Sequence, residues 1–310
     1  MYPQSELDYN IVNKIKEDSD NNSQAYKILD HMTSVFGPRL SGTKNYMDAA
    51  IWAKEKLESW GIENVHFESY SDDFRTWSMK SYSIELLKPR YMQINGLPYA
   101  WVRKTRGKIK GVPILIDHNN LTELTKYSGR LRGKIILNPT VRNRDDVRTG
   151  PFSDEVLAAA ANHNIPNNPD GLDNSGLEPI TESLKRRVSN KKETDIIQSF
   201  LLKEKVAAVI TGSASNNGII YAKQLPYHRQ GDLIPIPHFV IGKEDHRLIS
   251  DMINKGLKPE LSLQLNVNFK DVSDNHVNII GEIPGVDEEL KEQIVLIGGH
   301  YDSYHSGTGA

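Results

Sequence analysis

The chain has 310 residues, of which 38% are hydrophobic and 25% charged, so it is long enough for about two domains with cores of their own. Its formal net charge of −2 excludes a strong overall field toward nucleic acid or an anionic membrane surface, and neither is expected as a partner. Because the chain has no cysteine, disulfides and thiolate-bound metal are excluded, and any metal must bind histidines and carboxylates. No apolar run has the length of a membrane span, and no signal peptide is visible, so the sequence leaves the localisation open.

The first hundred residues predict two helices followed by two strands. Residues 22–35 have apolar side chains at helical spacing and stop at Gly37-Pro38, and a second helix is predicted over 46–60 with Gly61 as its carboxyl cap. Alternating patterns then predict strands over residues 64–70 and 81–87. This order is typical of the beginning of an α/β layer.

Between about Lys104 and Asp271 the sequence pattern differs from that of the flanking segments and is mostly typical of short strands. A helix is predicted from about Glu193, a surface loop over residues 162–178, and loop or interface positions for His228 and His238. Glu244, Asp245 and His246 are predicted to begin a helix, where acidic side chains interact favourably with the helix dipole. Short strands bounded by turn residues are predicted over 107–116, 133–137, 205–211, 235–241 and 261–267.

Two further strands are predicted near the end of the chain, over residues 276–282 and 293–299. The strand over 293–299 is expected to be central in one sheet, together with 276–282 and with the strands before Lys104. The second leads into His300 and Asp302, whose side chains point the same way if the backbone is extended. A carboxylate beside an imidazole accepts a hydrogen bond from one ring nitrogen and leaves the other for a metal. The pair therefore has two interpretations, a metal ligand with its orienting carboxylate or a hydrogen-bonded histidine at the end of a strand.

A series of motifs in fixed order favours the metal site. The blocks are Phe36-Gly-Pro-Arg-Leu-Ser-Gly-Thr43, Arg132-Gly-Lys-Ile135, Ile279-Ile-Gly-Glu-Ile-Pro-Gly285 and Val295-Leu-Ile-Gly-Gly-His-Tyr-Asp-Ser303, followed by Gly307-Thr-Gly-Ala310. Together they resemble the M28 family of zinc exopeptidases, and within it the carboxypeptidase Q branch. The resemblance spans nearly the whole chain, and its most specific parts are the first block and the Gly-His-x-Asp-Ser segment.

This resemblance implies a cofactor, site residues and partners. It implies two zinc ions per complete site, with His300 as a metal ligand and Asp302 as the residue that orients it, and a peptide substrate. The other family ligands and the general-base glutamate come after the Gly-Thr-Gly-Ala loop, so the chain as given is expected to bind zinc weakly and to be inactive alone. A homodimer and export to the periplasm or the extracellular space are implied in the same way.

The predicted fold is an incomplete α/β zinc-exopeptidase domain with a mixed sheet. Residues 1–103 and 272–310 are assigned to this domain, and residues 104–271 to an inserted, mostly β domain that resembles protease-associated domains. The predicted function is zinc-dependent metallocarboxypeptidase or dipeptidase action on small peptides. Aminopeptidase action and a non-catalytic binding module remain the alternatives. Arg39 is expected to pair with a carboxylate, either of an internal aspartate or of the substrate.

Overall fold

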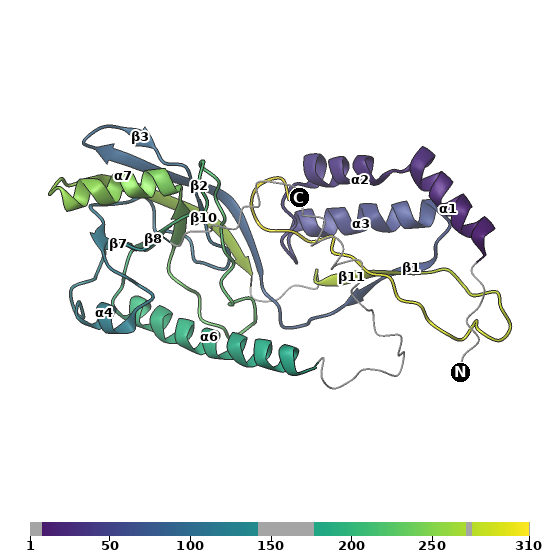
Figure 1. The fold of residues 1–310 in the computed structure, drawn as a ribbon. Helices are drawn as coiled ribbons and strands as arrows, with labels where there is room; N and C mark the ends of the chain where they lie inside the picture. The colour runs from purple at the N-terminus through teal and green to yellow at the C-terminus, as the bar shows by residue number, and fades with distance from the viewer. Residues whose placement is uncertain (1–7, 142–176, 271–274, 310) are drawn as a thin grey trace, which may run out of the picture. The chain divides into compact units, whose positions relative to one another are not determined.

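The computed structural model describes the backbone of residues 8–141, 177–270 and 275–309, and the side chains of the same residues except 177–187. The chain divides into two compact units (Figure 1). The first unit is formed by Met1–Ser78 together with Lys270–Ala310, and the second by Met79–Phe269. The first unit is therefore built from two segments that are far apart in the sequence.

The first and the third helix of the first unit begin at side-chain caps. The carboxylate of Asp8 accepts hydrogen bonds from the backbone of Asn10 and Ile11 and starts a first helix that the polar sequence did not predict. Thr43 caps the third helix through the backbone N–H of Tyr46, and this helix ends before Gly61, whose φ is +79°. The helical elements are α1 (Tyr9–Asn22), α2 (Ala25–His31), a π-helical turn (Met32–Phe36) and α3 (Lys44–Ser59).

One antiparallel ribbon supports these helices. It consists of β1 (Glu63–Ser69) and β11 (Val277–Glu282), which confirms the predicted pairing of the two segments. Tyr46 and Ala50 of α3 pack on Val277, so that α3 covers one face of the ribbon (Figure 1). The core of the first unit thus joins the two separate segments of the chain.

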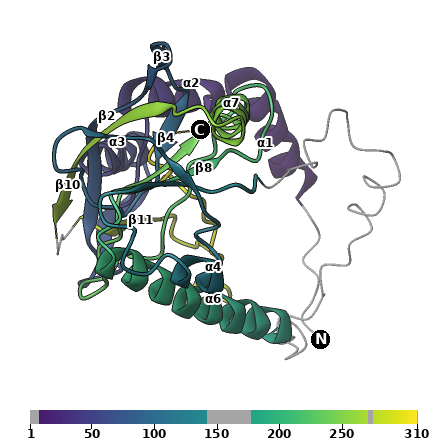
Figure 2. The same ribbon diagram turned by 90° about the vertical axis from the view of Figure 1, so that its left-hand side faces the viewer.

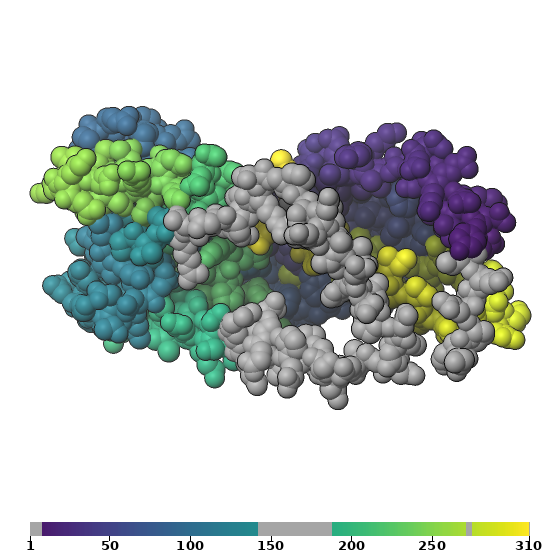
Figure 3. Space-filling view, viewed as in Figure 1, coloured from purple at the N-terminus to yellow at the C-terminus, as the bar shows by residue number. Residues whose placement is uncertain are grey.

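The strand predicted over residues 293–299 is absent from the structure, and the prediction of a central strand there is wrong. Residues 281–300 are all exposed, and Ile294, Val295, Leu296 and Ile297 are each about nine-tenths exposed. The yellow end of the chain accordingly lies at the surface in the space-filling view (Figure 3). The run of apolar residues favours a strand, but a strand also needs a partner, and no strand in the described part of the chain pairs with this segment.

The second unit contains two sheets. A four-stranded sheet has the order β3-β2-β10-β5, and a five-stranded sheet has the order β4-β9-β8-β7-β6. The strand predicted over residues 81–87 is part of β2 and pairs with β10, so its predicted place in a sheet with residues 276–282 is wrong. The strands are β2 (Thr76–Lys88), β3 (Met92–Gln93), β4 (Gly96–Pro98), β5 (Ile109–Gly111), β6 (Ile114–Leu115), β7 (Ile135–Leu137), β8 (Ala208–Gly212), β9 (His238–Ile241) and β10 (Glu260–Lys270).

Helices cover both faces of the five-stranded sheet, in which β6 to β9 are parallel and β4 is antiparallel (Figure 2). Ile197 and Leu201 of α6 (Leu177–Lys203) pack with Ile136 and Val209 on one face. On the other side lies α7 (Lys243–Asn254), which has Glu244 and Asp245 in its first turn as predicted. A short helix, α4 (Leu121–Thr125), follows β6.

Helix α6 begins earlier than expected, because residues 177 and 178 of the predicted loop belong to it, whereas residues 162–176 lie outside the described residues. No helix in the described part of the chain is long and apolar enough to cross a membrane.

Candidate functional site

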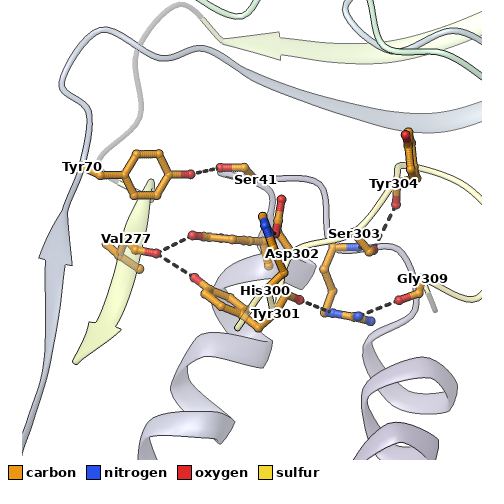
Figure 4. Close-up of polar contacts among 11 residues, drawn as sticks. Ser41, Tyr70, Val277, His300, Tyr301, Asp302, Ser303, Tyr304 and Gly309 are labelled. Carbon is orange, nitrogen blue, oxygen red and sulfur yellow. Dashed lines mark hydrogen bonds and ion pairs between the residues drawn. The ribbon is translucent and has the colours of Figure 1, made fainter. Parts of the chain in front are cut away.

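The structure brings His300 and Asp302 together in the first unit. Nδ1 of His300 lies 2.7 Å from Oδ1 of Asp302, and the His300 side chain is 93% exposed. In the neutral form of the ring, a hydrogen bond from Nδ1 to the carboxylate leaves the lone pair on Nε2. Figure 4 shows the two side chains beside each other. This arrangement fits a zinc ligand whose orientation is set by a carboxylate.

Arg39 lies behind this pair and binds backbone carbonyl groups. Its Nε donates to the Tyr301 carbonyl at 2.8 Å, its Nη1 to Met32 at 2.7 Å and Gly37 at 2.6 Å, and its Nη2 to Gly309 at 2.6 Å. The expected internal aspartate partner of Arg39 is wrong for the described residues, since four of its five N–H donors bind carbonyl groups. The alternative partner, a substrate carboxylate, stays a prediction. The guanidinium group thus binds carbonyl groups from both segments of the first unit, Met32 and Gly37 from one and Tyr301 and Gly309 from the other.

The main chain of Arg39 adds two more contacts to the same loop. Its N–H donates to Oγ of Ser303 at 2.8 Å, and its carbonyl accepts from the N–H of Ser303 at 3.0 Å. Burial lowers the pKa of the Arg39 guanidinium, whereas the negative charge of Asp302 acts in the opposite direction. Arg39 is 5% exposed, so its charge is compensated mainly by carbonyl dipoles.

Two stacked tyrosines fix the residue between the histidine and the aspartate. The rings of Tyr46 and Tyr301 are 4.6 Å apart, and both hydroxyl groups donate to the carbonyl of Val277, at 2.9 Å from Tyr301 (Figure 4). Burial raises the pKa of both tyrosines above the ordinary value of 10, so they remain protonated donors. Tyr301 is therefore held on one side by β11 and on the other by Arg39.

The Gly-Pro-Arg-Leu-Ser-Gly block makes a second set of contacts, with the residues that follow β1 and precede β11. Oγ of Ser41 hydrogen-bonds the hydroxyl of Tyr70 (Figure 4). The same oxygen lies 2.9 Å from Nδ1 of the buried His276. Gly42 has a φ of +77°, and a Cβ at this position would lie 2.4 Å from Cε1 of His276. Gly42 and Ser41 of the block are thus explained by close packing against His276.

Sequence reasoning found the candidate ligand but missed most of its supports. Tyr46, Tyr301 and His276 gave no signal beyond their positions near the recognised motifs, because their contacts depend on the fold. His305 is buried against Trp77, at 5.3 Å between ring centroids. The described residues contain no group of three or more histidines, aspartates or glutamates placed to hold a metal, so His300 stands as a single candidate ligand.

Comparison with solved structures shows the fold of the chain. The fold is that of M28 peptidases: a peptidase M28 precursor from Shewanella amazonensis SB2B superposes with a TM-score of 0.61 at 20% identity, over 97% of this chain and 59% of that one. An aminopeptidase from Aneurinibacillus sp. strain AM-1 gives a TM-score of 0.50 at 13% identity, over 92% of this chain and 53% of that one. The predicted α/β exopeptidase fold is confirmed.

Sequence comparison finds relatives among the carboxypeptidases Q. Carboxypeptidase Q of Mus musculus is 26% identical over 291 residues, and that of Homo sapiens 25% identical over 292 residues, each covering 93% of this chain and 51% of the relative. The resemblance to M28 zinc exopeptidases of the carboxypeptidase Q type, predicted from the motifs, is therefore confirmed. The chain spans about half the length of the curated relatives it matches. No family model matches the sequence.

Proposed function

We propose that the chain forms part of a zinc-dependent exopeptidase that hydrolyses small peptides. The observation that carries the proposal is the His300–Asp302 pair, at 2.7 Å, on a loop that Arg39 and Tyr301 hold in place. The relationship to carboxypeptidase Q supports the reaction class, and the M28 fold supports a metal-assisted hydrolysis.

His300 would hold a zinc ion through Nε2, and Asp302 would keep the ring in the tautomer and orientation that coordination needs. The donor set of imidazole and carboxylate suits zinc, and the absence of cysteine leaves no thiolate alternative. A zinc ion held there by His300 would supply Lewis-acid chemistry for the hydrolysis of a peptide bond. A second zinc ion, as the resemblance implies, would complete the site, and a homodimer is implied in the same way.

The second unit is proposed to correspond to an inserted domain of the protease-associated type. Its strands belong to two sheets of its own, which supports an independent unit. A non-catalytic binding role remains the alternative function, because the described residues supply one candidate ligand and a catalytic zinc needs about three.

The test uses the natural protein in which these residues occur. Dipeptide turnover should be abolished by a chelator and restored by zinc, and His300→Ala should lower kcat/KM by at least about 100-fold because a metal ligand is lost. His66→Ala, which removes an exposed histidine of β1, is the matched control and should retain activity. Turnover that survives both the chelator and His300→Ala would exclude the zinc mechanism.

Blocked substrates separate the possible end preferences. A carboxypeptidase cleaves an N-acetylated dipeptide but not a dipeptide amide, an aminopeptidase does the reverse, and a dipeptidase needs both ends free. Peptide binding without turnover of any of these substrates would favour the binding module.

A further inference from the structure

The second unit contains a polar cavity that has no part in the proposed metal chemistry. Its volume is about 570 Å³, and it lies beside β8 and β9 on the face of the five-stranded sheet that α6 covers. Asp117 and His118 line it from the segment after β6, Asn138 from the end of β7, Gln198 from α6 and His238 from β9. All of these residues belong to the second unit, so the cavity is complete within it.

His238 is buried at this cavity without a hydrogen-bonding partner. The side chain is 4% exposed, and neither Nδ1 nor Nε2 has a partner among the described residues. The sequence predicted a loop or interface position, which is wrong, because His238 begins β9 in register with Val209 of β8. Its ring stacks on Tyr99 at 4.1 Å between centroids, and the edge of His118 is 5.1 Å away. Stacking holds the ring but leaves both nitrogens unsatisfied.

Gln198 presents a second unsatisfied group from the opposite wall. Its side chain is 3% exposed, and its Oε1 has no hydrogen-bonding partner in the described part of the chain. Asn138 shows the contrast, because its Nδ2 lies 3.0 Å from Nδ1 of His118 and 3.2 Å from Oδ1 of Asp117. Buried polar groups in folded proteins are nearly always paired, so unpaired groups at a cavity indicate a missing ligand.

The chemistry of the lining selects the kind of ligand. Burial lowers the pKa of His238, and the charge of Lys223 acts in the same direction, so the neutral ring offers one donor and one acceptor. Gln198 offers an acceptor, and the lining also carries one carboxylate, Asp117, and one ammonium group, Lys223. A simple anion would be repelled by the charge of Asp117 and would leave the Gln198 oxygen unpaired. A simple cation would be repelled by the charge of Lys223. A ligand with both charges and both hydrogen-bonding roles satisfies the whole set.

We propose that this cavity binds an amino acid or a dipeptide in its zwitterionic form, with the carboxylate near Lys223 and the ammonium group toward Asp117 and Gln198. Such a site lies entirely within the second unit and needs neither His300 nor zinc. It stands independently of the proposed peptidase activity.

Calorimetry with the full chain tests the proposal in buffer that contains a chelator, so that turnover cannot contribute heat. The probes are alanine, glutamate, glycyl-glycine and alanyl-glutamine, with acetate, ethylamine and glucose as representatives of the rejected ligand classes. We expect saturable binding of at least one zwitterion and of none of the other three. Binding of acetate, ethylamine or glucose alone, or of no probe, would overturn the proposal.

Variants assign the binding to the cavity. His238→Phe keeps the stacking on Tyr99 but removes both nitrogens, and Gln198→Met removes the unpaired oxygen with little change in volume; each should weaken binding by about tenfold or more. Arg247→Gln on the exposed side of α7 is the control and should bind like the parent chain. If His238→Phe does not fold, Gln198→Met carries the test alone. Binding that both cavity variants retain would show that the ligand lies elsewhere.

Discussion

Arg39 donates its Nε–H to the carbonyl oxygen of Tyr301 at 2.8 Å, and Tyr301 stands between His300 and Asp302 in the sequence. The backbone that joins the candidate ligand to its orienting carboxylate is therefore fixed by a buried arginine. Three more carbonyl groups on the same guanidinium make the arrangement rigid, because each N–H bond has a defined direction.

Replacing Arg39 by lysine should destabilise the first unit although the charge is kept. A lysine ammonium group donates from one nitrogen and cannot reach four carbonyl groups that surround a planar fork, so buried acceptors are left unpaired. We expect the free energy of unfolding to fall by about 2 kcal/mol or more in urea denaturation. Arg247→Lys, at an exposed position of α7, should change it by less than about 0.5 kcal/mol. Equal midpoints for the two variants would contradict a structural role of the guanidinium group.

Replacing Asp302 by asparagine tests the role of the carboxylate. The His300 ring would lose its anionic partner at 2.7 Å, and both its tautomer and its orientation would become less fixed. In the natural protein that contains these residues, zinc affinity should fall by about 10- to 100-fold, measured by competition with a chromophoric chelator. Asp287→Asn alters an exposed turn of the first unit and serves as the control. A loss of affinity in His300→Ala without any loss in Asp302→Asn would reject the orienting role while keeping the ligand.

The sequence predicted local elements well where one segment determines its own structure. The helix over residues 46–60 has an apolar stripe and a terminal glycine, and α3 occupies nearly the same range. The alternating patterns of residues 64–70 and 276–282 likewise predicted β1 and β11, because half-buried strands show a period of two. Helix α1 was missed because its polar surface carries no apolar stripe, and its capping aspartate alone is a weak signal.

Pairing and side-chain contacts could not be predicted in this way. Residues 81–87 form a strand as expected, yet nothing in their alternation shows that β10 rather than β11 pairs with them. The candidate site was predicted at His300 and Asp302, since a two-residue spacing in extended backbone is enough to bring them together. The carbonyl partners of Arg39 come from positions up to 270 residues away, and backbone acceptors leave no trace in the side-chain sequence.

Acid should destabilise the second unit through His118. Burial lowers the pKa of His118 from 6.5 to about 4, so between these values the unfolded chain binds a proton that the folded chain does not. Stability is then unaffected well above pH 6.5 and falls as the pH decreases toward 4. His118→Gln should reduce the loss of unfolding free energy between pH 7 and pH 5 by about 2 kcal/mol, measured by urea denaturation at both values.

An exposed histidine provides the control for this pH effect. The pKa of His66 is raised by its hydrogen bond to the Asn64 carbonyl, so its contribution has the opposite sign and is lost as the pH rises. His66→Gln should leave the pH dependence unchanged or slightly steeper. A steeper dependence in His118→Gln would mean that His118 is protonated in the folded protein.

The exposed apolar run of residues 294–297 should promote self-association of the chain. Four consecutive aliphatic side chains that no described strand pairs with form a surface that can pair with another copy. Val295→Lys combined with Ile297→Lys should lower the aggregate fraction in size-exclusion chromatography and leave the unfolding midpoint unchanged, because both side chains are already exposed. The double change Ile11→Lys and Ile15→Lys on α1 adds the same charge to another exposed face. An equal effect of the two double variants would assign the improvement to net charge alone.

Gly42 and Gly61 provide a comparison between steric exclusion and backbone strain. Both have positive φ values, +77° and +79°, so an alanine at either position costs about 1 kcal/mol of strain. At Gly61 no atom lies within 4 Å of the added methyl group, whereas at Gly42 the methyl group would lie 2.4 Å from Cε1 of His276 and 2.9 Å from Cγ2 of Thr76. Gly42→Ala must therefore displace a buried ring that Ser41 holds by a hydrogen bond.

We expect Gly61→Ala to lower the free energy of unfolding by about 1 kcal/mol and Gly42→Ala by about 3 kcal/mol or more, both measured by urea denaturation. Hydrogen exchange should show where the difference arises. The amides of β11 next to His276 should lose protection in Gly42→Ala and keep it in Gly61→Ala, because only the first substitution disturbs the contact between the Ser41 loop and this strand. Similar losses of stability in the two variants would show that positive φ alone, and not the approach of His276, requires glycine at position 42.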